Sequence, residues 1–155
     1  METRATGRIK QQTSDGFYKR LFRLTIAGGL AFWVTNFLTS LLPIAAEYRA
    51  ALSIAYVPMI LVESLLGGMV VGFCVGYVLL RFYDRIPTEN PILKAAILSV
   101  VALVIATLMF QGAASLLEPS DAVHYFLVGA MLNVPRFLIL GIVVGYLYKR
   151  LYGST

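Results

Sequence analysis

Four long apolar stretches dominate the chain, and short polar segments separate them. Each stretch holds ~20 or more mostly apolar residues, which is the length that an α-helix needs to cross a bilayer. The stretches cover residues 22–44, 58–82, 92–117 and 122–148. The pattern predicts an all-α, polytopic membrane protein with four transmembrane helices. Because the stretches use most of the chain, no soluble domain is expected besides a polar arm at residues 1–20.

The first stretch requires a separate argument, because a cleaved signal peptide also contains an apolar run. In a signal peptide that run is about 7–15 residues long and ends at a small-residue cleavage site. The run here is longer, and Ile44-Ala45-Ala46 is a poor cleavage sequence. We therefore expect the first helix to be retained.

Local chemistry predicts where two of the helices begin. Asn90 followed by Pro91 suits the start of the third helix, with asparagine as the N-cap and proline in the first turn. Ser120 and Asp121 suit the start of the fourth helix, where a carboxylate also favours the helix dipole. Pro135 lies inside the fourth helix and is expected to kink it.

The chain also contains an internal repeat. Residues 72–83 match residues 141–152 without a gap, and residues 40–42 match residues 115–117 more weakly. The identical pairs of the stronger match are Gly72/Gly141, Gly76/Gly145, Tyr77/Tyr146, Arg81/Arg150 and Tyr83/Tyr152. The match predicts two parallel two-helix hairpins, at about residues 19–85 and 92–154, related by an axis along the membrane normal. The alternative is that cytoplasmic ends of unrelated membrane helices share these residue types.

Glycines recur every four residues on the second and fourth predicted helices. They are Gly68, Gly72 and Gly76 on the second, and Gly141 and Gly145 on the fourth. Such rows let helix backbones approach closely where lipid supplies no hydrophobic drive. The simplest expectation is that helix two packs against helix four. The alternative is that one row serves a homodimer.

Composition and charge agree with a membrane protein and indicate its orientation. The chain is 59% hydrophobic and 14% charged, with a net charge of +5, whereas soluble domains are about 25% charged. Most Lys and Arg residues lie in the N-terminal segment, in the loop after the second stretch and at the C-terminus. This is the positive-inside pattern and not a nucleic-acid-binding patch. It predicts cytoplasmic N and C termini in a multi-pass protein of the inner or plasma membrane.

The basic N-terminal arm, residues 1–20, precedes a four-helix transmembrane domain at residues 21–155. We expect the arm to lie along anionic lipid headgroups, because clustered basic residues next to a membrane helix are attracted to them. Docking to a partner protein is the alternative. The lipid bilayer itself is the one partner that the composition requires.

One polar residue from each predicted helix lies at a similar depth, five to eight residues from the outer end. At ~1.5 Å of rise per residue this is roughly 8–12 Å below the outer surface. The four residues are Asn36, Glu63, Gln111 and Asn133. Arg136 lies about one turn deeper than Asn133 on the same helix face. These five residues form the predicted intramembrane polar site.

Arg136 and Glu63 are the two charged residues that lie away from the ends of the apolar stretches, whereas Arg23, Arg81 and Lys94 lie close to the ends. A guanidinium in hydrocarbon requires a partner. The hypothesis is a buried ion pair, with the neighbouring amides completing its hydrogen bonds. The pair could serve structure alone, fixing helix register, or line a cavity that binds a solute or ion. One geometric point opposes the pair, since both residues flank the glycine rows on the same side. Gln111 or a bound anion is then the alternative partner of Arg136.

Two connecting segments are informative. The first outer loop, residues 45–52, has a helix-forming composition and could lie in the interface as a lid over the polar layer. The inner loop contains Tyr83-Asp84-Arg85-Ile86-Pro87, which suits a tight turn, where Asp and Pro are common. A docking segment for a partner is the alternative for this loop.

The residues required by common catalytic or cofactor chemistry are missing. His124 and Cys74 are single in the sequence, so neither a bis-histidine haem, a zinc site nor a Cys-X-X-Cys pair can form. No phosphate-binding glycine motif opens a helix. We expect no metal, no cofactor and no catalytic residue. A non-catalytic membrane subunit, scaffold or assembly factor is the first functional hypothesis. A small oligomeric channel or carrier is the second, and a membrane-embedded enzyme the third.

Overall fold

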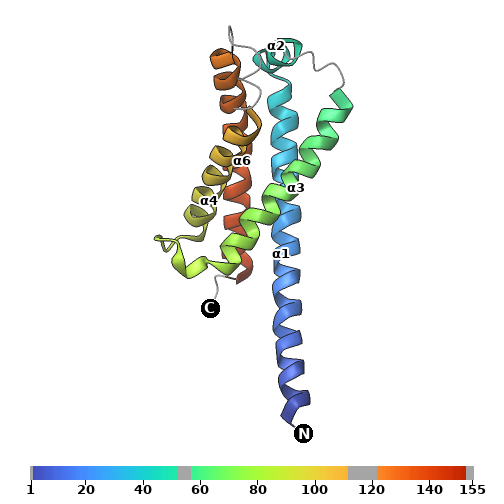
Figure 1. Cartoon of the computed structure of the whole chain (residues 1–155), viewed down its shortest axis with the longest axis vertical. Helices are drawn as coiled ribbons and strands as arrows, with labels where there is room; N and C mark the ends of the chain where they lie inside the picture. The colour runs from blue at the N-terminus through green and yellow to red at the C-terminus, as the bar shows by residue number, and fades with distance from the viewer. Residues whose placement is uncertain (1, 52–56, 112–121, 153–155) are drawn as a thin grey trace.

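A computed structural model describes residues 2–51, 57–111 and 122–152, with side chains over residues 16–50, 58–109 and 123–152. Its elements, in chain order, are α1 (Glu2–Ser40), α2 (Pro43–Ala51), α3 (Val57–Arg81), η1 (Tyr83–Arg85), α4 (Pro91–Ala106), η2 (Thr107–Gln111) and α6 (Ala122–Tyr152). Within these ranges the chain is all-helical and contains no strand. Figure 1 shows α1, α3, α4 and α6 as the long helices, with α2 lying across one end.

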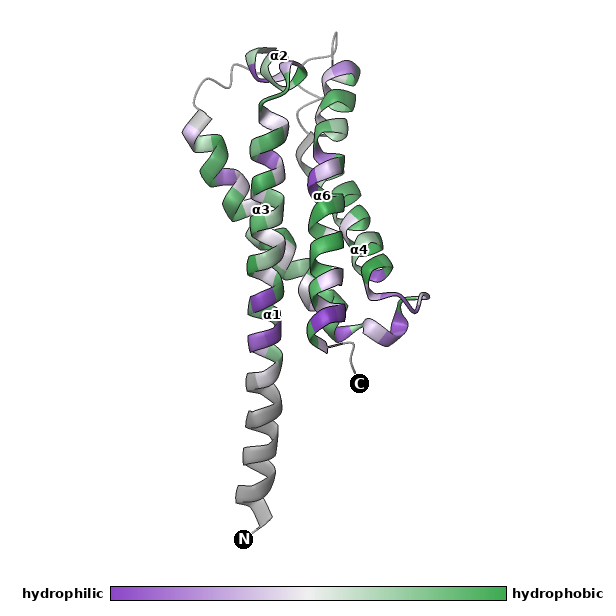
Figure 2. Ribbon diagram, turned by 180° about the vertical axis from the view of Figure 1, so that it is seen from behind, coloured by the Kyte–Doolittle hydropathy of each residue, from purple (hydrophilic) through white to green (hydrophobic). Residues whose placement is uncertain are grey.

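Four helices of the described chain are long and apolar enough to cross a membrane. The apolar segments are Gly16–Ser40, Pro58–Arg81, Pro91–Met109 and Val123–Tyr152. They match the four stretches expected from the hydrophobic pattern. Figure 2 shows the same segments as mainly hydrophobic ribbon, with hydrophilic residues on α1, on α6 and in the loop at the end opposite α2, and others on α2 itself. The prediction of four membrane-length helices is confirmed.

The N-terminal arm and the first apolar segment belong to one continuous helix. α1 runs from Glu2 to Ser40 without a break, so residue 20 marks a change in composition and not a change in structure. In Figure 1 the first half of α1 extends well beyond the ends of the other helices. The arm therefore continues along the axis of the first span.

The predicted starts of the third and fourth helices have different outcomes. Asn90 caps α4, because its Oδ1 accepts a hydrogen bond of 3.0 Å from the Ile92 N–H, and Pro91 is the first helical residue. This prediction is confirmed. Ser120 and Asp121 lie outside the described residues. α6 continues as a single helix through Pro135.

Each glycine row faces the first helix of its own hairpin, so the expected packing of helix two against helix four is wrong. A Cβ added at Gly72 would lie 2.9 Å from the Thr25 carbonyl oxygen of α1, and one at Gly145 would lie 2.8 Å from the Pro91 carbonyl oxygen. The close approach is possible because α1 and α4 also present small residues at the crossings. These are Gly28, Gly29, Ala95 and Ser99.

The apolar core lies where α1, α3, α4 and α6 meet. Leu24, Leu79 and Leu140 are fully buried in it. Toward the α2 end, the rings of Phe32 on α1 and Phe137 on α6 meet edge to face, with centroids 5.3 Å apart. Aromatic pairs in this geometry add roughly 0.5–1.5 kcal/mol beyond the area that they bury. This contact fixes α1 against α6 directly beneath the polar residues.

Segment 83–87, between α3 and α4, forms a short turn that packs onto the bundle. Tyr83–Arg85 is one turn of 3₁₀-helix, and the Arg85 N–H donates to the Phe82 carbonyl at 3.0 Å. The Lys94 ammonium donates to the Tyr83 carbonyl at 2.5 Å and lies 3.7 Å from the centre of the Tyr83 ring. The same ring stacks on Tyr148 of α6 at 4.9 Å. The predicted turn is confirmed.

Candidate functional site

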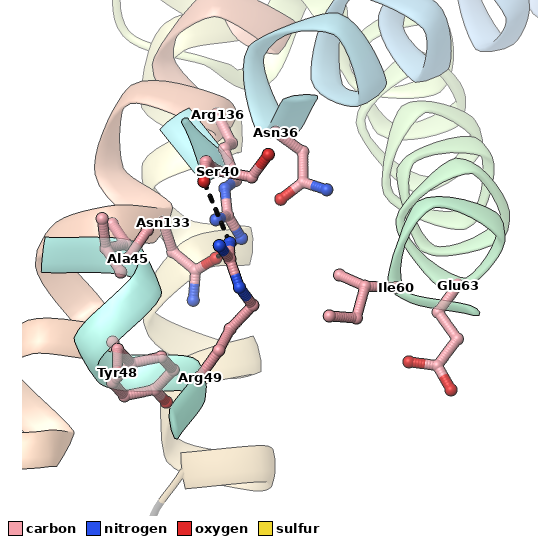
Figure 3. Close-up of a pocket in the computed structure, with 11 residues that line it drawn as sticks. Asn36, Ser40, Ala45, Tyr48, Arg49, Ile60, Glu63, Asn133 and Arg136 are labelled. Atoms are coloured by element: carbon pink, nitrogen blue, oxygen red, sulfur yellow. Dashed lines mark hydrogen bonds between the residues drawn. The ribbon is translucent and has the colours of Figure 1, made fainter. Parts of the chain in front are cut away.

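A cavity of about 180 Å³ lies at the α2 end of the bundle, between α1, α2, α3 and α6. Four of the five residues predicted to form an intramembrane polar site line it: Asn36, Glu63, Asn133 and Arg136. Figure 3 shows these side chains together with the residues that α2 contributes. Gln111, the fifth residue, ends η2, and its side chain is outside the described part of the chain.

α2 is the helix expected in the first outer loop, and it forms one wall of this cavity. Ala45, Tyr48 and Arg49 are its lining residues. In Figures 1 and 3 the helix crosses the end of α1 and approaches α6. The rings of Tyr48 and Tyr125, 6.4 Å apart, link it to the first turn of α6. The helix is confirmed at residues 43–51, and its position places it over the polar residues.

Two side chains, one on α6 itself and one on α1, hold the Arg136 guanidinium in place. Its Nη1 donates to the Asn133 Oδ1 at 2.9 Å, one turn back on α6. Its Nε donates to the Thr39 Oγ1 of α1 at 3.3 Å. Arg136 and Asn133 can bond because residues three apart share a helix face. Thr39 was not predicted, because its position next to Arg136 depends on how α1 packs against α6 and not on a local sequence pattern.

The hypothetical Glu63–Arg136 ion pair is not formed. Both residues line the cavity, yet neither shares an ion pair with any described residue, and Arg136 bonds neutral oxygens instead. Figure 3 shows Glu63 on the far side of Ile60 from Arg136. The reason is the path of α3, which crosses α1 at an angle and diverges from α6 toward the α2 end (Figures 1 and 2).

Arg49 of α2 brings a second guanidinium to the cavity. Arg49 was not among the residues predicted to form the site. Its Nη1 donates to the Ser40 carbonyl, at the end of α1, at 3.0 Å. Figure 3 shows the guanidinium groups of Arg49 and Arg136 converging on the same space. The sequence feature that could have indicated Arg49 is its position in the segment predicted to form a helical lid, because a side chain of such a helix can face the polar residues below it. Two like charges share one cavity wall, and no described carboxylate lies between them.

Asn36 adds a neutral donor between these cations and α3. The residue is only 2% exposed, and its Nδ2 has no hydrogen-bond partner among the described residues. In Figure 3 the amide lies between Arg136 and Ile60. A buried amide without a partner costs roughly 1–3 kcal/mol. The cavity wall thus combines two guanidinium groups with an amide donor that has no partner in the described part of the chain.

The wall can bind an anionic oxygen, because guanidinium and amide N–H groups are its donors. Metal binding has no such support: the described residues contain no cluster of three or more His, Cys, Asp or Glu side chains. His124 contacts the Tyr125 ring at 5.4 Å and does not line the cavity.

The fold and the cavity define a small all-helical protein of the multi-span membrane class, with a polar cavity inside its apolar helices. Comparison with protein-family models, with curated proteins and with solved structures finds no match for the chain. Function therefore has to be argued from the chemistry of this site.

Proposed function

We propose that the protein binds a small anionic solute in this cavity and acts as a small membrane channel or carrier. The observation that supports the proposal is the convergence of Arg49 and Arg136 on one cavity without a described carboxylate between them. An arginine cannot lose its charge, and both of these side chains are half-buried, so the lack of a counter-ion among the described residues costs free energy. A bound anion supplies the missing charge and can accept from the free Asn36 amide.

A purely structural role for these residues explains less. A structural buried charge is expected to be paired and fully hydrogen-bonded, since an incomplete polar network destabilises the fold. Here the Asn36 Nδ2 has no partner within the described ranges, and both arginines bond neutral oxygens. Binding sites tolerate such incomplete pairing because the ligand completes it.

The proposed orientation places α2 and the cavity at the outer face. It rests on the charge pattern, because basic residues concentrate at the arm, the η1 loop and the C-terminus. The N and C termini are then cytoplasmic, and the membrane is the inner or plasma membrane of the cell. A solute enters from outside, below α2.

The proposed architecture is an arm at residues 1–20 followed by a domain of two parallel hairpins at residues 21–155. Similar close approaches support a duplication: Gly72 faces α1 and Gly141 faces α4, each at a helix crossing. Four helices enclose little volume, so transport by this chain requires an oligomer or a substantial opening of the cavity.

The scaffold hypothesis retains one specific support, the length of α1. Its N-terminal half extends beyond the bundle as a continuous helix (Figure 1). A projecting basic helix can contact anionic headgroups only near its base, and it can dock a partner protein along its length. This role is compatible with a solute site at the other end of the molecule.

Anion binding is testable with the full chain purified in an uncharged detergent. Isothermal titration with ethyl phosphate should show saturable binding, and Arg136→Gln should weaken it at least about tenfold, because a charge-assisted, two-pronged contact is lost. Arg81→Gln, at the exposed inner end of α3, is the matched control and should bind like the native chain. Equal binding by the Arg136 and Arg81 variants, or no binding by the native chain, refutes the site.

Transport requires a second measurement. Vesicles containing the protein and loaded with phosphate should release it faster than vesicles containing the Arg136→Gln variant. Binding without release would leave a binding protein and eliminate the channel or carrier.

A further inference from the structure

Glu63 is a carboxylate in an unusual place. It lies inside the apolar segment Pro58–Arg81, its side chain is exposed, and it shares no hydrogen bond or ion pair with another described residue. A charged carboxylate facing hydrocarbon is costly, so such residues face cavities or cationic partners. Glu63 does line the cavity, on the α3 wall.

The two walls of the cavity therefore carry opposite charge. Arg49 and Arg136 lie on the side formed by α2 and α6, and Glu63 lies on α3 with Ile60 between them (Figure 3). The separation prevents the opposite charges from neutralising each other. A molecule that spans the cavity can contact both walls at once.

The position of the α3 wall is fixed by a contact close to Glu63. The indole Nε1 of Trp33 on α1 donates to the Leu61 carbonyl at 3.0 Å. Leu61 is two residues before Glu63, so this bond holds the second turn of α3 against α1. Trp33 is also the single tryptophan of the chain, and its fluorescence can report changes beside the cavity.

We propose that the ligand of this site is a zwitterion, with its anionic group bound by Arg136 and Arg49 and its ammonium bound by Glu63. This inference rests on the proposed function and specifies the ligand class of the same cavity. The cavity of about 180 Å³ suits a molecule of several non-hydrogen atoms, since one water occupies ~30 Å³ in the liquid. Ile60 then contacts the short apolar link between the two charged groups.

The same chemistry can come from a free solute or from the headgroup of an ethanolamine phospholipid. Three pairs of probes separate a free solute from a lipid headgroup. Within each pair, one probe carries an ammonium group and the other lacks it. They are O-phosphoethanolamine against ethyl phosphate, β-alanine against propionate, and dihexanoyl phosphatidylethanolamine against dihexanoyl phosphatidic acid. Preference in the first two pairs identifies a free solute, and preference in the lipid pair alone identifies a headgroup.

The measurement is binding to the full chain in uncharged detergent, by titration calorimetry and by Trp33 fluorescence. In at least one pair the zwitterion should bind about tenfold more tightly than its ammonium-free partner, because a charged hydrogen bond is added. Glu63→Gln should reduce that ratio to about one, and Glu63→Asp should preserve part of it. Glu47→Gln, on the exposed face of α2, is the control and should leave the ratio unchanged.

The outcomes distinguish this inference from the proposed function. If ammonium-free anions bind as tightly as the zwitterions, and Arg136→Gln abolishes both, the anion site stands and the zwitterion is refuted. If none of the six probes binds, both proposals fail. If Glu63→Gln changes the oligomeric state measured by sedimentation and leaves the binding ratio intact, a second chain satisfies Glu63 and the zwitterion is likewise refuted.

Discussion

Arg136 on α6 and Thr39 on α1 are joined by a hydrogen bond of 3.3 Å between Nε and Oγ1, although 97 positions separate them in the chain. Together with the bond from Arg136 to Asn133, it sets the direction of the guanidinium. A guanidinium carries five N–H donors, so these two bonds leave donors for a ligand. The contact lies next to the Phe32–Phe137 pair, which also packs α6 against α1.

Replacing Arg136 with lysine should weaken anion binding while preserving the charge. Lysine lacks the planar fork that binds an oxyanion at two points and cannot reproduce the contacts to Thr39 and Asn133 together. We expect Arg136→Lys to bind ethyl phosphate roughly three- to tenfold more weakly than the native chain, but more tightly than Arg136→Gln. Titration calorimetry measures the order. If Arg136→Lys and Arg136→Gln lose the same affinity for ethyl phosphate, the positive charge by itself does not contribute to binding and the expected order is contradicted.

Replacing Asn36 with leucine should stabilise the protein and abolish ligand binding. The amide is buried, and no described residue pairs with its Nδ2. Removing an unpaired buried donor gains roughly 1–2 kcal/mol if the shape is kept. Unfolding in detergent, monitored by circular dichroism, measures the gain. Thr35→Val is a matched control, because Thr35 is equally buried but already bonds the Ala31 carbonyl at 2.7 Å. A loss of stability in Asn36→Leu would contradict the assignment of an unpaired amide.

Replacing Gly145 with alanine should loosen the contact between α4 and α6. The new Cβ would lie 2.5 Å from the Ile92 Cα and 2.8 Å from the Pro91 carbonyl oxygen. Backbone atoms cannot rotate away, so we expect a loss of about 1–3 kcal/mol. Gly67→Ala is the control, since its Cβ would meet nothing within 4 Å and alanine raises helix propensity by ~1 kcal/mol. Unfolding that is equal in both variants would contradict the close crossing.

Much of the fold was predictable, because membrane spans carry strong local signals. Hydrophobic length predicted the four helices, and the Asn90 cap depends on adjacent residues alone. The partner of each glycine row was not predictable. A row of small residues indicates that another helix backbone packs closely against it. It does not indicate which helix supplies the matching small residues. Gly28 and Gly29 on α1 supply it for α3.

The residues of the site were predictable from their distance to the helix ends, but the partners of Arg136 were not. Asn36, Glu63 and Asn133 were expected at a similar distance from their helix ends, because the rise per residue is constant in all helices, and all three line one cavity. Arg136, one turn deeper than Asn133 on the same helix face, lines it too. The rotation and tilt of α3 decide whether Glu63 reaches Arg136, and no local pattern encodes them. Arg49 was missed for a similar reason, because the direction of a lid helix depends on what it covers.

Replacing Lys94 with methionine should release the turn at Tyr83–Arg85 from the bundle. Lys94 is 4% exposed, and its ammonium contacts both the carbonyl and the ring of Tyr83. Methionine keeps much of the apolar stem but loses the charged hydrogen bond and the cation–π contact. We expect faster amide hydrogen exchange over residues 83–90, measured by mass spectrometry. Lys149→Met, exposed at the end of α6, should exchange like the native chain, and unchanged exchange in both variants would contradict the anchoring role.

The orientation can be tested with single cysteines at opposite ends of the bundle. Cys74 is the sole native cysteine, so Cys74→Ser gives a background in which one new thiol reports alone. Glu47→Cys lies on α2 and Glu89→Cys lies in the loop before α4, and both positions are exposed. The excess of Lys and Arg at the η1 end predicts that this end is cytoplasmic. A membrane-impermeant maleimide added to intact cells should therefore label Glu47→Cys, and should label Glu89→Cys only after the cells are opened. The reverse pattern would place the cavity at the cytoplasmic face and require its solute to come from inside.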